Sequence, residues 1–539
     1  MTRRTAGAAA AIFLAVAGTL FIFHAPRLIF SPDEGIMLEA AQRMLRGQKL
    51  YVDFFGYMSP GSYWLQELVF RCLGLSLRAA RLVVILDFAV ECALIFWITA
   101  RFGHRKAAFG AAALFFLFEA SNPTLILPWH WWDSTALSLL AIALGLEGAW
   151  TGKRRYWLGA GMLVTLAAFC TPSIAYLAVI TGLATLAPSW RRFLPPFVLA
   201  AAATAATLVL AMMAGGYLQP LMAQMRWLSK NYTGVNVTPY GAVLGGYAAL
   251  LEKMAGVALP IRGLLLLSAT LAAVLPVVAI LGWGTAFLLR KGMARSSAFR
   301  LPILYLLACM AGYVASTYPR PDMTHLMRVA PLAYVLVTIL ICEYLPTAAR
   351  TATLVLMASC AAMPAIQSAI AIAAETPVAT PVGKVRVAPE DRPAVQRLLR
   401  LVRPGQTLYV HPYLPLFYFL TQTANPTRFS YLQPGMMTGQ NELEVLHDLE
   451  RSPPEWILYL PLQREDYLRV FPSAKDKPYR FEKIEAWLHA NYAELDPPLS
   501  VSGYHLLARY DWESYGEPSL GRGHHPRDPV SAGGIDGAR

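Results

Sequence analysis

The ten residues IFSPDEGIML (29–38) place two adjacent carboxylates, Asp33 and Glu34, directly after a long apolar run. In residues 35–47 apolar positions recur at helical spacing with polar residues between them, which predicts a short amphipathic helix on a membrane surface that ends at Gly47. The two acids would stand at the N-terminus of that helix, where the helix dipole favours negative charge. Asp33 is therefore either a helix N-cap or a residue with a chemical role.

The composition indicates a membrane protein. Of the 539 residues, 56% are hydrophobic and 15% are charged, whereas soluble domains carry about 25% charged residues. Several apolar stretches also exceed the roughly 18 to 20 residues that cross a bilayer. The net charge of +13 does not indicate nucleic-acid binding, because much of the Lys and Arg lies in short loops between apolar runs, where it sets topology. The lipid bilayer is an expected partner and nucleic acid is not.

The cysteines give no sign of a disulfide framework or a metal centre. All six lie in or beside apolar segments, and none follows residue 360. No Cys-x-x-Cys pair or Cys/His cluster indicates zinc, and no acidic group has the tight spacing of a metal site. We therefore predict neither a metal nor another cofactor.

Window length and helix-breaking residues predict about eleven membrane spans. They cover residues 6–30, 79–100, 107–126, 134–150, 157–171, 173–188, 195–217, 260–289, 301–317, 329–346 and 351–373. Pro172 marks either a turn between two spans or a break inside one. One set of loops is rich in Lys and Arg and is cytoplasmic by the positive-inside rule. That set is RFGHRK (101–106), GKRR (152–155), SWRR (189–192) and RKGMARSSAFR (290–300), with Arg3, Arg4 and Arg350.

The other loops then face the extracytoplasmic side of the inner (plasma) membrane. They are residues 31–78, 127–134, 218–259 and 316–328, with everything after about residue 374. The notable polar groups fall on this side: Asp33, Glu34, Asp53, His130, Asp133, Arg320, Asp322, His325 and Arg328. Dispersed polar groups that share one membrane face are what a single active site requires.

Two segments carry a resemblance to a known superfamily. SPDEG (31–35), YVD (51–53) and SPG (59–61) follow the first span, and RPDMTHLMRVAPL (320–332) leads into a late span. Together they resemble loops of the GT-C glycosyltransferases, which include the protein O-mannosyltransferases and the lipid A aminoarabinose transferases. The resemblance implies a polytopic α-helical membrane protein of GT-C type over residues 1–374.

The resemblance also implies a reaction. Members take a sugar from a polyprenyl-phosphate carrier and invert its anomeric centre by in-line attack. The chain is therefore expected to be an inverting hexosyl or pentosyl transferase that acts on a glycan, lipid or protein acceptor. Asp33 matches the base of the superfamily by position. Glu34 is expected to orient the loop or to bind acceptor, and Asp53 to position polar groups of donor or acceptor.

The departing phosphate needs positive charge at the same membrane face. Arg320, His325 and Arg328 lie between two predicted spans and meet this need. The alternative is a solvated loop in which Arg320 pairs with Asp322.

Further binding candidates lie near other segment ends. Arg81 lies just inside the second span, where an arginine is costly and usually paired or functional; it pairs with Asp33 or phosphate, or it snorkels to the surface. PWHWWDS (128–134) contains His130 and Asp133 beside three tryptophans, which suits either an aromatic belt or a donor-sugar site. Lys230 is placed to contact the carrier phosphate or lipid headgroups.

After about residue 375 the composition becomes that of a soluble domain. The predicted strands are TLYVHP (407–412), TRFSYL (427–432), EWILYL (455–460) and SGYHLLARY (502–510), with helical segments between them. This alternation predicts a small extracytoplasmic α/β domain over residues 375–513 with a largely parallel sheet. We expect this domain to handle acceptor or assembly rather than chemistry. Residues 514–539 are predicted to be a disordered tail.

Two other classes of function stay open. A transporter or flippase of lipid-linked glycans would have ionisable residues at mid-depth in several spans and repeat symmetry between its halves. Only Asp87 and Glu91 stand at such positions, with Glu119 and Glu147 as further candidates, and no repeat is visible. A non-catalytic envelope assembly protein would explain the C-terminal domain, but not the acids and cations that share one face.

Overall fold

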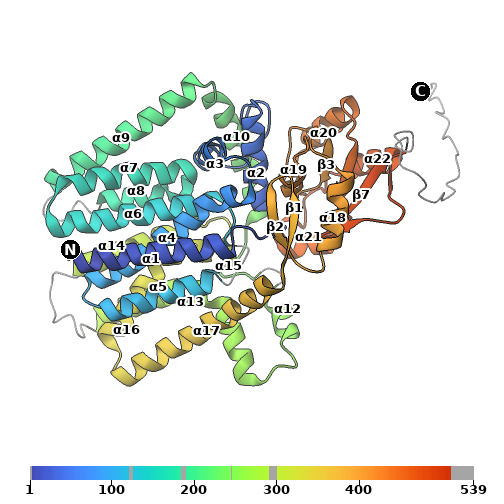
Figure 1. Cartoon of the computed structure of the whole chain (residues 1–539). Helices are drawn as coiled ribbons and strands as arrows, with labels where there is room; N and C mark the ends of the chain where they lie inside the picture. The colour runs from blue at the N-terminus through green and yellow to red at the C-terminus, as the bar shows by residue number, and fades with distance from the viewer. Residues whose placement is uncertain (1–2, 121–124, 184–189, 244–245, 290–299, 511–539) are drawn as a thin grey trace, which may run out of the picture.

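A computed structural model of the chain describes residues 3–120, 125–183, 190–243, 246–289 and 300–510. A bundle of long helices forms one end of the molecule, and a smaller domain that contains a sheet forms the other (Figure 1). The tail predicted at 514–539 lies outside the described residues. The division into an apolar helical part and a C-terminal sheet domain agrees with the sequence analysis.

Six helices of the described part are long and apolar enough to cross a membrane. They are α1 (Arg3–Phe23), α4 (Leu77–Arg101), α6 (His130–Thr151), α9 (Trp190–Ala214), α13 (Leu259–Leu288) and α17 (Thr347–Ala374). Shorter bundle helices are α5 (Arg105–Ala120), α7 (Arg154–Cys170), α8 (Ala175–Leu183), α14 (Arg300–Ser316) and α16 (Pro331–Tyr344). Each predicted span overlaps one of these helices. At Pro172 a short 3-10 helix, η1 (Pro172–Ile174), separates α7 from α8.

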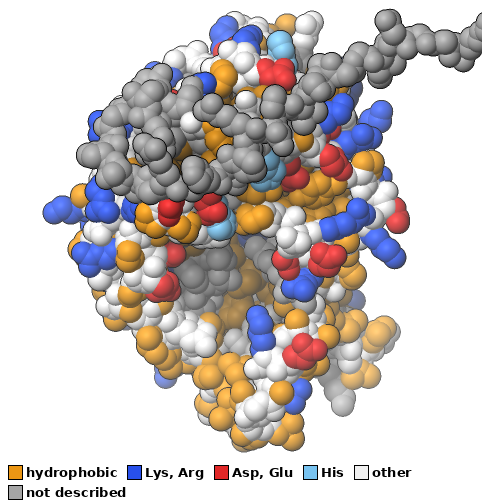
Figure 2. Space-filling view, turned by 90° about the vertical axis from the view of Figure 1, so that its right-hand side faces the viewer, with side chains coloured by type: hydrophobic (Ala, Val, Ile, Leu, Met, Phe, Trp, Pro, Cys, Tyr) orange, Lys and Arg blue, Asp and Glu red, His pale blue; other side chains and the backbone are white. Residues whose placement is uncertain are grey.

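The bundle has a buried centre and an apolar outside. Helices α4 and α6 are mostly buried, whereas α1 and α9 bury little of their surface. Exposed apolar side chains such as Ile22 on α1 and Leu199 on α9 are what a lipid-facing helix presents. Figure 2, the view onto the end that holds the C-terminal domain, shows mainly hydrophobic side chains along its lower edge and charged side chains higher up.

The first loop folds into two helices, α2 (Pro32–Leu45) and α3 (Pro60–Leu73). Proline at the first helical position suits a helix start because its missing N–H has no partner there. Ser31 is the N-cap of α2, so Asp33 lies inside the first turn and the N-cap alternative is wrong. The short helix predicted from residue 35 forms, but most of its residues are buried, and it packs against α3 and against α19 of the C-terminal domain.

The loops after α9 contain several short helices. They are α10 (Leu218–Asn231), α11 (Thr233–Asn236) and α12 (Gly246–Lys253), with α15 (Met323–Arg328) between α14 and α16. These helices and α2 lie at the end of the bundle that meets the C-terminal domain (Figure 1). This end of the bundle is therefore where the predicted extracytoplasmic segments gather.

The C-terminal domain has a hairpin and a five-stranded mixed sheet. Its elements are β1 (Thr376–Thr380), β2 (Gly383–Val387), α18 (Arg392–Leu401), β3 (Leu408–His411), α19 (Leu416–Thr421), α20 (Gly439–Arg451), β4 (Trp456–Tyr459), α21 (Arg464–Val470), η5 (Pro472–Ala474), α22 (Glu482–Asn491), β5 (Tyr492–Glu494), β6 (Ser500–Val501) and β7 (Tyr504–Arg509). The strand order is β3-β4-β7-β5, and β6 pairs with β7. Only β3 and β4 among these pairs are parallel.

The prediction of a largely parallel sheet is therefore wrong. Residues 427–432 form no strand, because their main chain bonds to other loops instead. The Phe55 N–H of the first loop donates to the Arg428 carbonyl (2.9 Å), and the Leu432 N–H donates to the Pro412 carbonyl (2.8 Å). This segment is a bridge between the two parts of the molecule.

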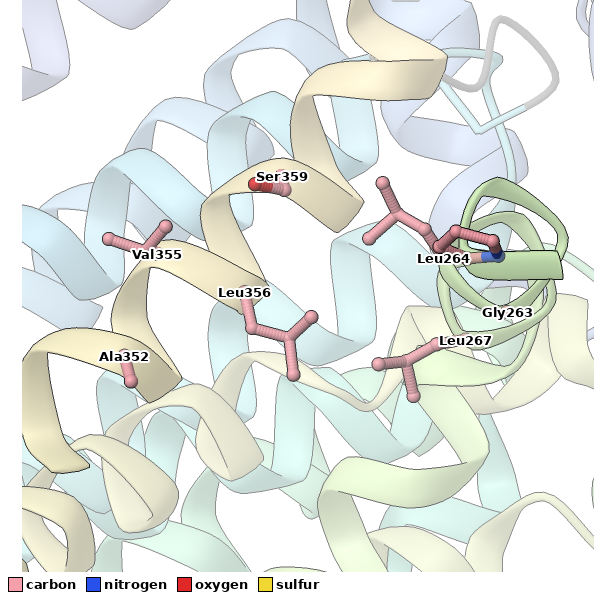
Figure 3. Close-up of a pocket in the computed structure, with 8 residues that line it drawn as sticks. Gly263, Leu264, Leu267, Ala352, Val355, Leu356 and Ser359 are labelled. Atoms are coloured by element: carbon pink, nitrogen blue, oxygen red, sulfur yellow. The ribbon is translucent and has the colours of Figure 1, made fainter. Parts of the chain in front are cut away.

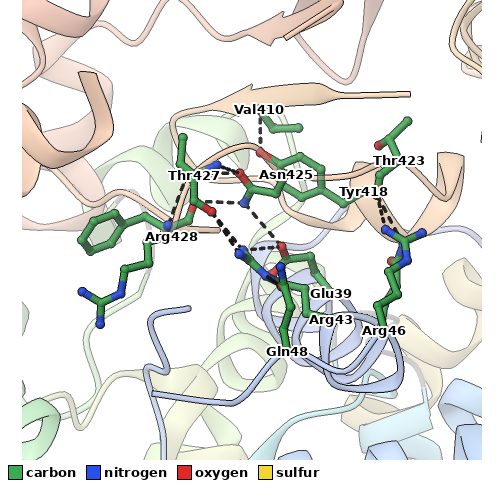
Figure 4. A network of polar contacts seen from close by, with 12 residues as sticks. Glu39, Arg43, Arg46, Gln48, Val410, Tyr418, Thr423, Asn425, Thr427 and Arg428 are labelled. Carbon is green, nitrogen blue, oxygen red and sulfur yellow. Dashed lines mark hydrogen bonds and ion pairs between the residues drawn. The ribbon is translucent and has the colours of Figure 1, made fainter. Parts of the chain in front are cut away.

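A polar network joins α2 to the C-terminal domain (Figure 4). The Arg43 guanidinium pairs with Glu39 (3.2 Å) and donates twice to the Thr427 carbonyl (both 3.1 Å). The Asn425 amide donates to the same Glu39 carboxylate (3.3 Å), and Arg46 donates to the Thr423 carbonyl (3.0 Å). Since Arg43 and Glu39 are buried, these bonds fix the position of α2 under the C-terminal domain.

Gly35 allows the closest approach in this interface. A Cβ at this position would lie 2.2 Å from the Leu416 backbone nitrogen and 2.8 Å from the Pro415 carbonyl carbon. Both atoms belong to backbone, so they cannot move aside as a flexible side chain would. Glycine is therefore required here for α2 to pack against the start of α19.

We expect Gly35→Ala to loosen the C-terminal domain. The overpacking should cost about 1–3 kcal/mol and lower the melting temperature of the purified protein, with earlier proteolysis between the two parts. Gly18→Ala is the matched control, because a Cβ there meets nothing within 4 Å and alanine stabilises a helix by about 0.5–1 kcal/mol relative to glycine. Equal melting temperatures for the two variants would show that the close approach is unimportant.

Candidate active site

A cavity of about 940 Å³ lies where the bundle, the first loop and the C-terminal domain meet. Its walls come from residues 31–36 and 57–59 of the first loop, 129–131, 170–173, 225–236 on α10 and α11, 317–328, and parts of 413–471. The first loop (31–78) and the late loop (316–328), which the sequence predicts to share one membrane face, thus converge on one site. Of the predicted site residues, the cavity wall contains Asp33, His130, Arg320, His325 and Arg328.

Asp33 and Arg328 face each other in this cavity. The Arg328 Nη2 donates to Asp33 Oδ2 (3.2 Å). The Asp33 side chain is 43% exposed, whereas that of Arg328 is 4% exposed. Position 33 in the first turn of α2 therefore presents a carboxylate to solvent or ligand, beside a cation held in the wall.

Arg328 keeps unused hydrogen-bond donors. Its Nε and Nη1 atoms are buried and have no hydrogen-bond partner among the described residues. Its guanidinium also lies 5.8 Å from the centre of the Trp129 ring. A buried donor without a partner costs about 1–3 kcal/mol, so these two groups are suited to an anionic ligand in the cavity.

Asp322 organises the loop before α15. Its carboxylate caps the helix by accepting from the His325 N–H (3.0 Å), and it also contacts His325 Nδ1 (2.8 Å) and Arg320 Nε (2.6 Å). Burial alone would raise the pKa of Asp322, but the His325 contact and the Arg320 charge hold this pKa well below its usual range. Burial lowers the pKa of His325, although Asp322 opposes that shift. Arg320 thus supplies the positive charge of this cluster.

Each of the three guanidinium nitrogens of Arg320 donates a hydrogen bond. Besides Asp322, it donates from Nη1 to the Asn236 side-chain oxygen (3.2 Å) and from Nη2 to the Val470 carbonyl (3.3 Å). Its guanidinium also lies 4.6 Å from the centre of the Phe471 ring. The solvated-loop alternative was right about the Arg320–Asp322 pair and wrong about solvation, because Arg320 is buried. Arg320 therefore links the late loop to α11 and to the C-terminal domain.

His130 stands at the start of α6 on the cavity wall. Its Nδ1 atom contacts the Thr171 hydroxyl (2.8 Å), and Thr171 Oγ1 also donates to the His130 carbonyl (3.1 Å). Thr171 follows α7, so this pair fixes the ends of two helices together. The neighbouring Trp129 and Trp131 also line the cavity.

Glu34 and Arg81 lie outside the cavity, in a buried ion pair. Arg81 donates from Nε and Nη2 to the two Glu34 carboxylate oxygens (2.8 and 2.9 Å) and from Nη1 to the His24 carbonyl (2.8 Å). Both side chains are almost fully buried. The partner of Arg81 is therefore Glu34 rather than Asp33 or phosphate, and Arg81 does not snorkel.

Three more predicted site residues are not among the residues that line the cavity. Asp53 is exposed and accepts from the Lys49 N–H (2.6 Å), so it stabilises a turn of the first loop. Lys230 is exposed on α10. Asp133 is buried inside the bundle beside Asp87. Among the described residues no group of three or more His, Cys, Asp or Glu side chains is arranged to hold a metal ion.

Sequence reasoning missed most of the aromatic lining. Tyr57, Tyr413 and Tyr431 line the cavity, and the Tyr57 hydroxyl donates to the Tyr431 carbonyl. Tyr232, which follows α10, also lies on the wall. The tyrosines in YLPLFY (413–418) and SYLQPG (430–435) were the available signal, but only the tertiary fold brings Tyr413 and Tyr431 to this cavity.

A second hollow has no such chemistry. It lies between α13 and α17 and is lined by side chains such as Leu264, Leu267, Val355 and Leu356, with Ser359 at its edge (Figure 3). None of its lining residues is ionisable. This hollow therefore offers no group that could transfer a proton or pair with an anion.

Comparison with known proteins finds relatives by structure. No protein-family model and no curated protein sequence matches the chain. ArnT from Cupriavidus metallidurans bound to undecaprenyl phosphate superimposes with a TM-score of 0.54 at 13% identity, over 95% of this chain and 99% of that chain. Archaeal oligosaccharyltransferase AglB from Archaeoglobus fulgidus, in complex with an inhibitory peptide and a dolichol-phosphate, gives a TM-score of 0.50 at 11% identity, over 94% of this chain and 74% of that chain.

Both of these proteins are GT-C glycosyltransferases. The chain therefore has the GT-C fold, and the resemblance drawn from the first-loop and late-loop motifs is confirmed as a likeness of fold. At these identities the activity has to be argued from the site itself.

We expect Glu34→Gln to destabilise the protein far more than Asp33→Asn. Removing one partner of a buried ion pair leaves an unpaired charge and costs about 3–5 kcal/mol, whereas Asp33 is 43% exposed. Thermal unfolding in detergent measures both variants. The double variant Glu34→Met with Arg81→Met should recover much of the loss, because it removes both charges. Equal melting of the two single variants would contradict the division between a structural and an exposed carboxylate.

Proposed function

We propose that this chain is an inverting glycosyltransferase that moves a sugar from a polyprenyl-phosphate carrier to an acceptor hydroxyl. The observation that carries the proposal is the pair in the cavity: an exposed Asp33 carboxylate beside Arg328, whose Nε and Nη1 lack partners among the described residues. A base beside a cation that keeps unused hydrogen-bond donors is what this transfer needs. The shared GT-C fold with ArnT, a structure bound to undecaprenyl phosphate, supports the same carrier class.

The proposed reaction has one displacement step. Asp33 accepts the proton of the acceptor hydroxyl while the oxygen of that hydroxyl attacks the anomeric carbon. The bond between that carbon and the carrier phosphate breaks, and the phosphate leaves with the bonding electrons. Arg328 stabilises the charge that develops on it, because a preorganised cation in a buried site acts strongly on a developing anion. Arg320 and Asp322 hold the loop that carries Arg328 rather than contacting phosphate.

Substitutions at Asp33 and Arg328 should separate chemistry from binding. Asp33→Asn should lower turnover by at least about 100-fold, since general-base catalysis contributes about 100- to 10,000-fold, while undecaprenyl phosphate binds no more weakly. Arg328→Ala should weaken that binding about 10- to 100-fold, because hydrogen bonds to charged groups contribute about 1.5–3 kcal/mol. Native mass spectrometry in nanodiscs measures binding, and transfer from the co-purified lipid measures turnover.

Lys230→Ala is the matched control, because Lys230 is an exposed cation that does not line the cavity. Near-normal turnover of Asp33→Asn would refute Asp33 as the base. Movement of the lipid across the bilayer without any new glycosidic product would favour the transporter class instead.

We also propose that the cavity and the C-terminal domain face the extracytoplasmic side of the inner membrane. The loops at 101–106, 152–155 and 189–192 are basic and lie on the opposite side in the predicted topology. A lipid-linked donor and an envelope acceptor would then meet outside the cytoplasm.

Cysteine labelling tests this orientation. Cys72 is the exposed native thiol of the described residues, and the other cysteines are buried. The variant Cys72→Ser therefore removes the native thiol that would react with the label. In intact spheroplasts Ser452→Cys in the C-terminal domain should react with a membrane-impermeant maleimide. Lys106→Cys at the start of α5 should react only after permeabilisation. The reverse pattern would place the site in the cytoplasm.

A further inference from the structure

The cavity has two chemically different walls. Its arginines, Arg320 and Arg328, and its two histidines come from the helical bundle and its loops (residues 3–374), which we call the membrane half. The C-terminal domain supplies the opposite wall through its lining residues between 413 and 471, which we call the roof. Asp466 carries the one charge among these roof residues, and it is negative. The roof residues themselves therefore offer no cation, and Arg320, which lies against Phe471 of the roof, already has its donors bonded to Asp322, Asn236 and the Val470 carbonyl.

The roof is built around tyrosines. The Tyr431 ring centre lies 5.7 Å from that of Tyr413 and 5.4 Å from that of Tyr57, which lines the cavity from the first loop. The Tyr431 hydroxyl also reaches the Gln433 side-chain oxygen (3.5 Å). Aromatic faces thus alternate with hydroxyl and amide groups along this wall.

The roof is also fixed in place. The Tyr57 hydroxyl donates to the Tyr431 carbonyl, and the Tyr467 hydroxyl donates to the Pro434 carbonyl. Ser473, just after α21, donates to the Val237 carbonyl (2.6 Å). A wall tied to the first loop and to the end of α11 loses little conformational entropy when a ligand binds.

The roof lies beside the proposed base. Burial first, and then the charge of Asp33, raise the pKa of Tyr431 well above its ordinary value. Both residues line the same cavity. A molecule held on the tyrosines therefore lies within reach of Asp33, which is itself paired with Arg328.

These features select among acceptor chemistries. A phosphorylated acceptor would require a cation on this wall, and Asp466 would repel it. The two cations of α21, Arg464 and Arg469, are not among the residues that line this cavity, and Arg469 pairs with Asp466 (3.0 Å). A saccharide ring has an apolar C–H face and a rim of hydroxyls, which match tyrosine faces interleaved with amide and carboxylate acceptors.

We infer that the roof is the acceptor subsite and that it takes an uncharged saccharide, an inference that rests on the proposed transferase function. Arg328 then serves the carrier phosphate alone. The two substrates are separated by charge: the anionic donor binds beside Arg328, and the neutral acceptor binds on the roof.

Saturation-transfer NMR on the full chain in nanodiscs loaded with undecaprenyl phosphate tests this inference. The probes are trisaccharides of glucose, mannose and galactose, each neutral and with a terminal phosphate, and a Ser/Thr hexapeptide. At least one neutral trisaccharide should bind, and its phosphorylated form should bind at least about 10-fold more weakly. Tighter binding of the phosphorylated form or of the peptide, or binding of none of the probes, would overturn the inference.

Variants locate the binding on the roof. Tyr413→Ala should weaken the neutral trisaccharide about 3- to 10-fold, the range expected for a lost aromatic contact, whereas Tyr413→Phe should retain it. Asp466→Lys should narrow the difference between the neutral and phosphorylated forms. Tyr510→Ala is the matched control, because Tyr510 is an exposed tyrosine of the same domain that does not line the cavity. Equal binding by Tyr413→Ala and Tyr510→Ala would contradict a site on the roof.

Carrier binding in the same samples separates the two proposals. If undecaprenyl phosphate binds and depends on Arg328 while the neutral trisaccharides fail, the acceptor inference alone is wrong. If the carrier does not bind the wild-type protein, the proposed transferase function fails, whatever the saccharides do. Retained carrier binding by Tyr413→Ala also shows that this variant is folded.

Discussion

The buried ion pair between Glu34 and Arg81 fixes the geometry of the site. An arginine inside a membrane protein is costly unless it is paired, and here one guanidinium also bonds the His24 carbonyl at the end of α1. The pair therefore ties α1, the first turn of α2 and α4 together. Adjacent residues of a helix point in directions about 100° apart, so fixing Glu34 inward directs Asp33 toward the cavity. The Glu34 carboxylate therefore has a structural role, whereas the Asp33 carboxylate lines the cavity.

The first loop is held from both sides. The Glu34–Arg81 ion pair binds it to the helical bundle. The Glu39–Arg43 network and the close contact of Gly35 with Leu416 attach it to the C-terminal domain. The cavity consequently exists only when both parts of the chain are in place, since its walls come from both. In the proposed transferase, the C-terminal domain would thus shape the reaction site even though Asp33 and Arg328 belong to other segments.

The sequence predicted the convergence of distant loops better than the partners within them. Loop charges and apolar runs place Asp33 and Arg328 on one membrane face, and they meet at 3.2 Å although 295 positions separate them. Position in a sequence does not tell whether Glu34 or Asp33 faces Arg81, because both lie in the same helical turn. Nor does composition show that residues 427–432 bridge to Phe55 instead of forming a strand, since those hydrogen bonds depend on how the two parts dock.

Arg320 and Arg328 show why a predicted cation still needs its surroundings. Both lie in RPDMTHLMR (320–328) and were equal candidates for the phosphate. Arg320 already bonds Asp322, Asn236 and Val470, so contacting a phosphate would cost it bonds that hold the late loop. Arg328 has two donors to spare and touches Asp33 with the third. In the proposed reaction the same guanidinium would thus lie beside the sugar, with the base at one of its edges and the departing phosphate at another.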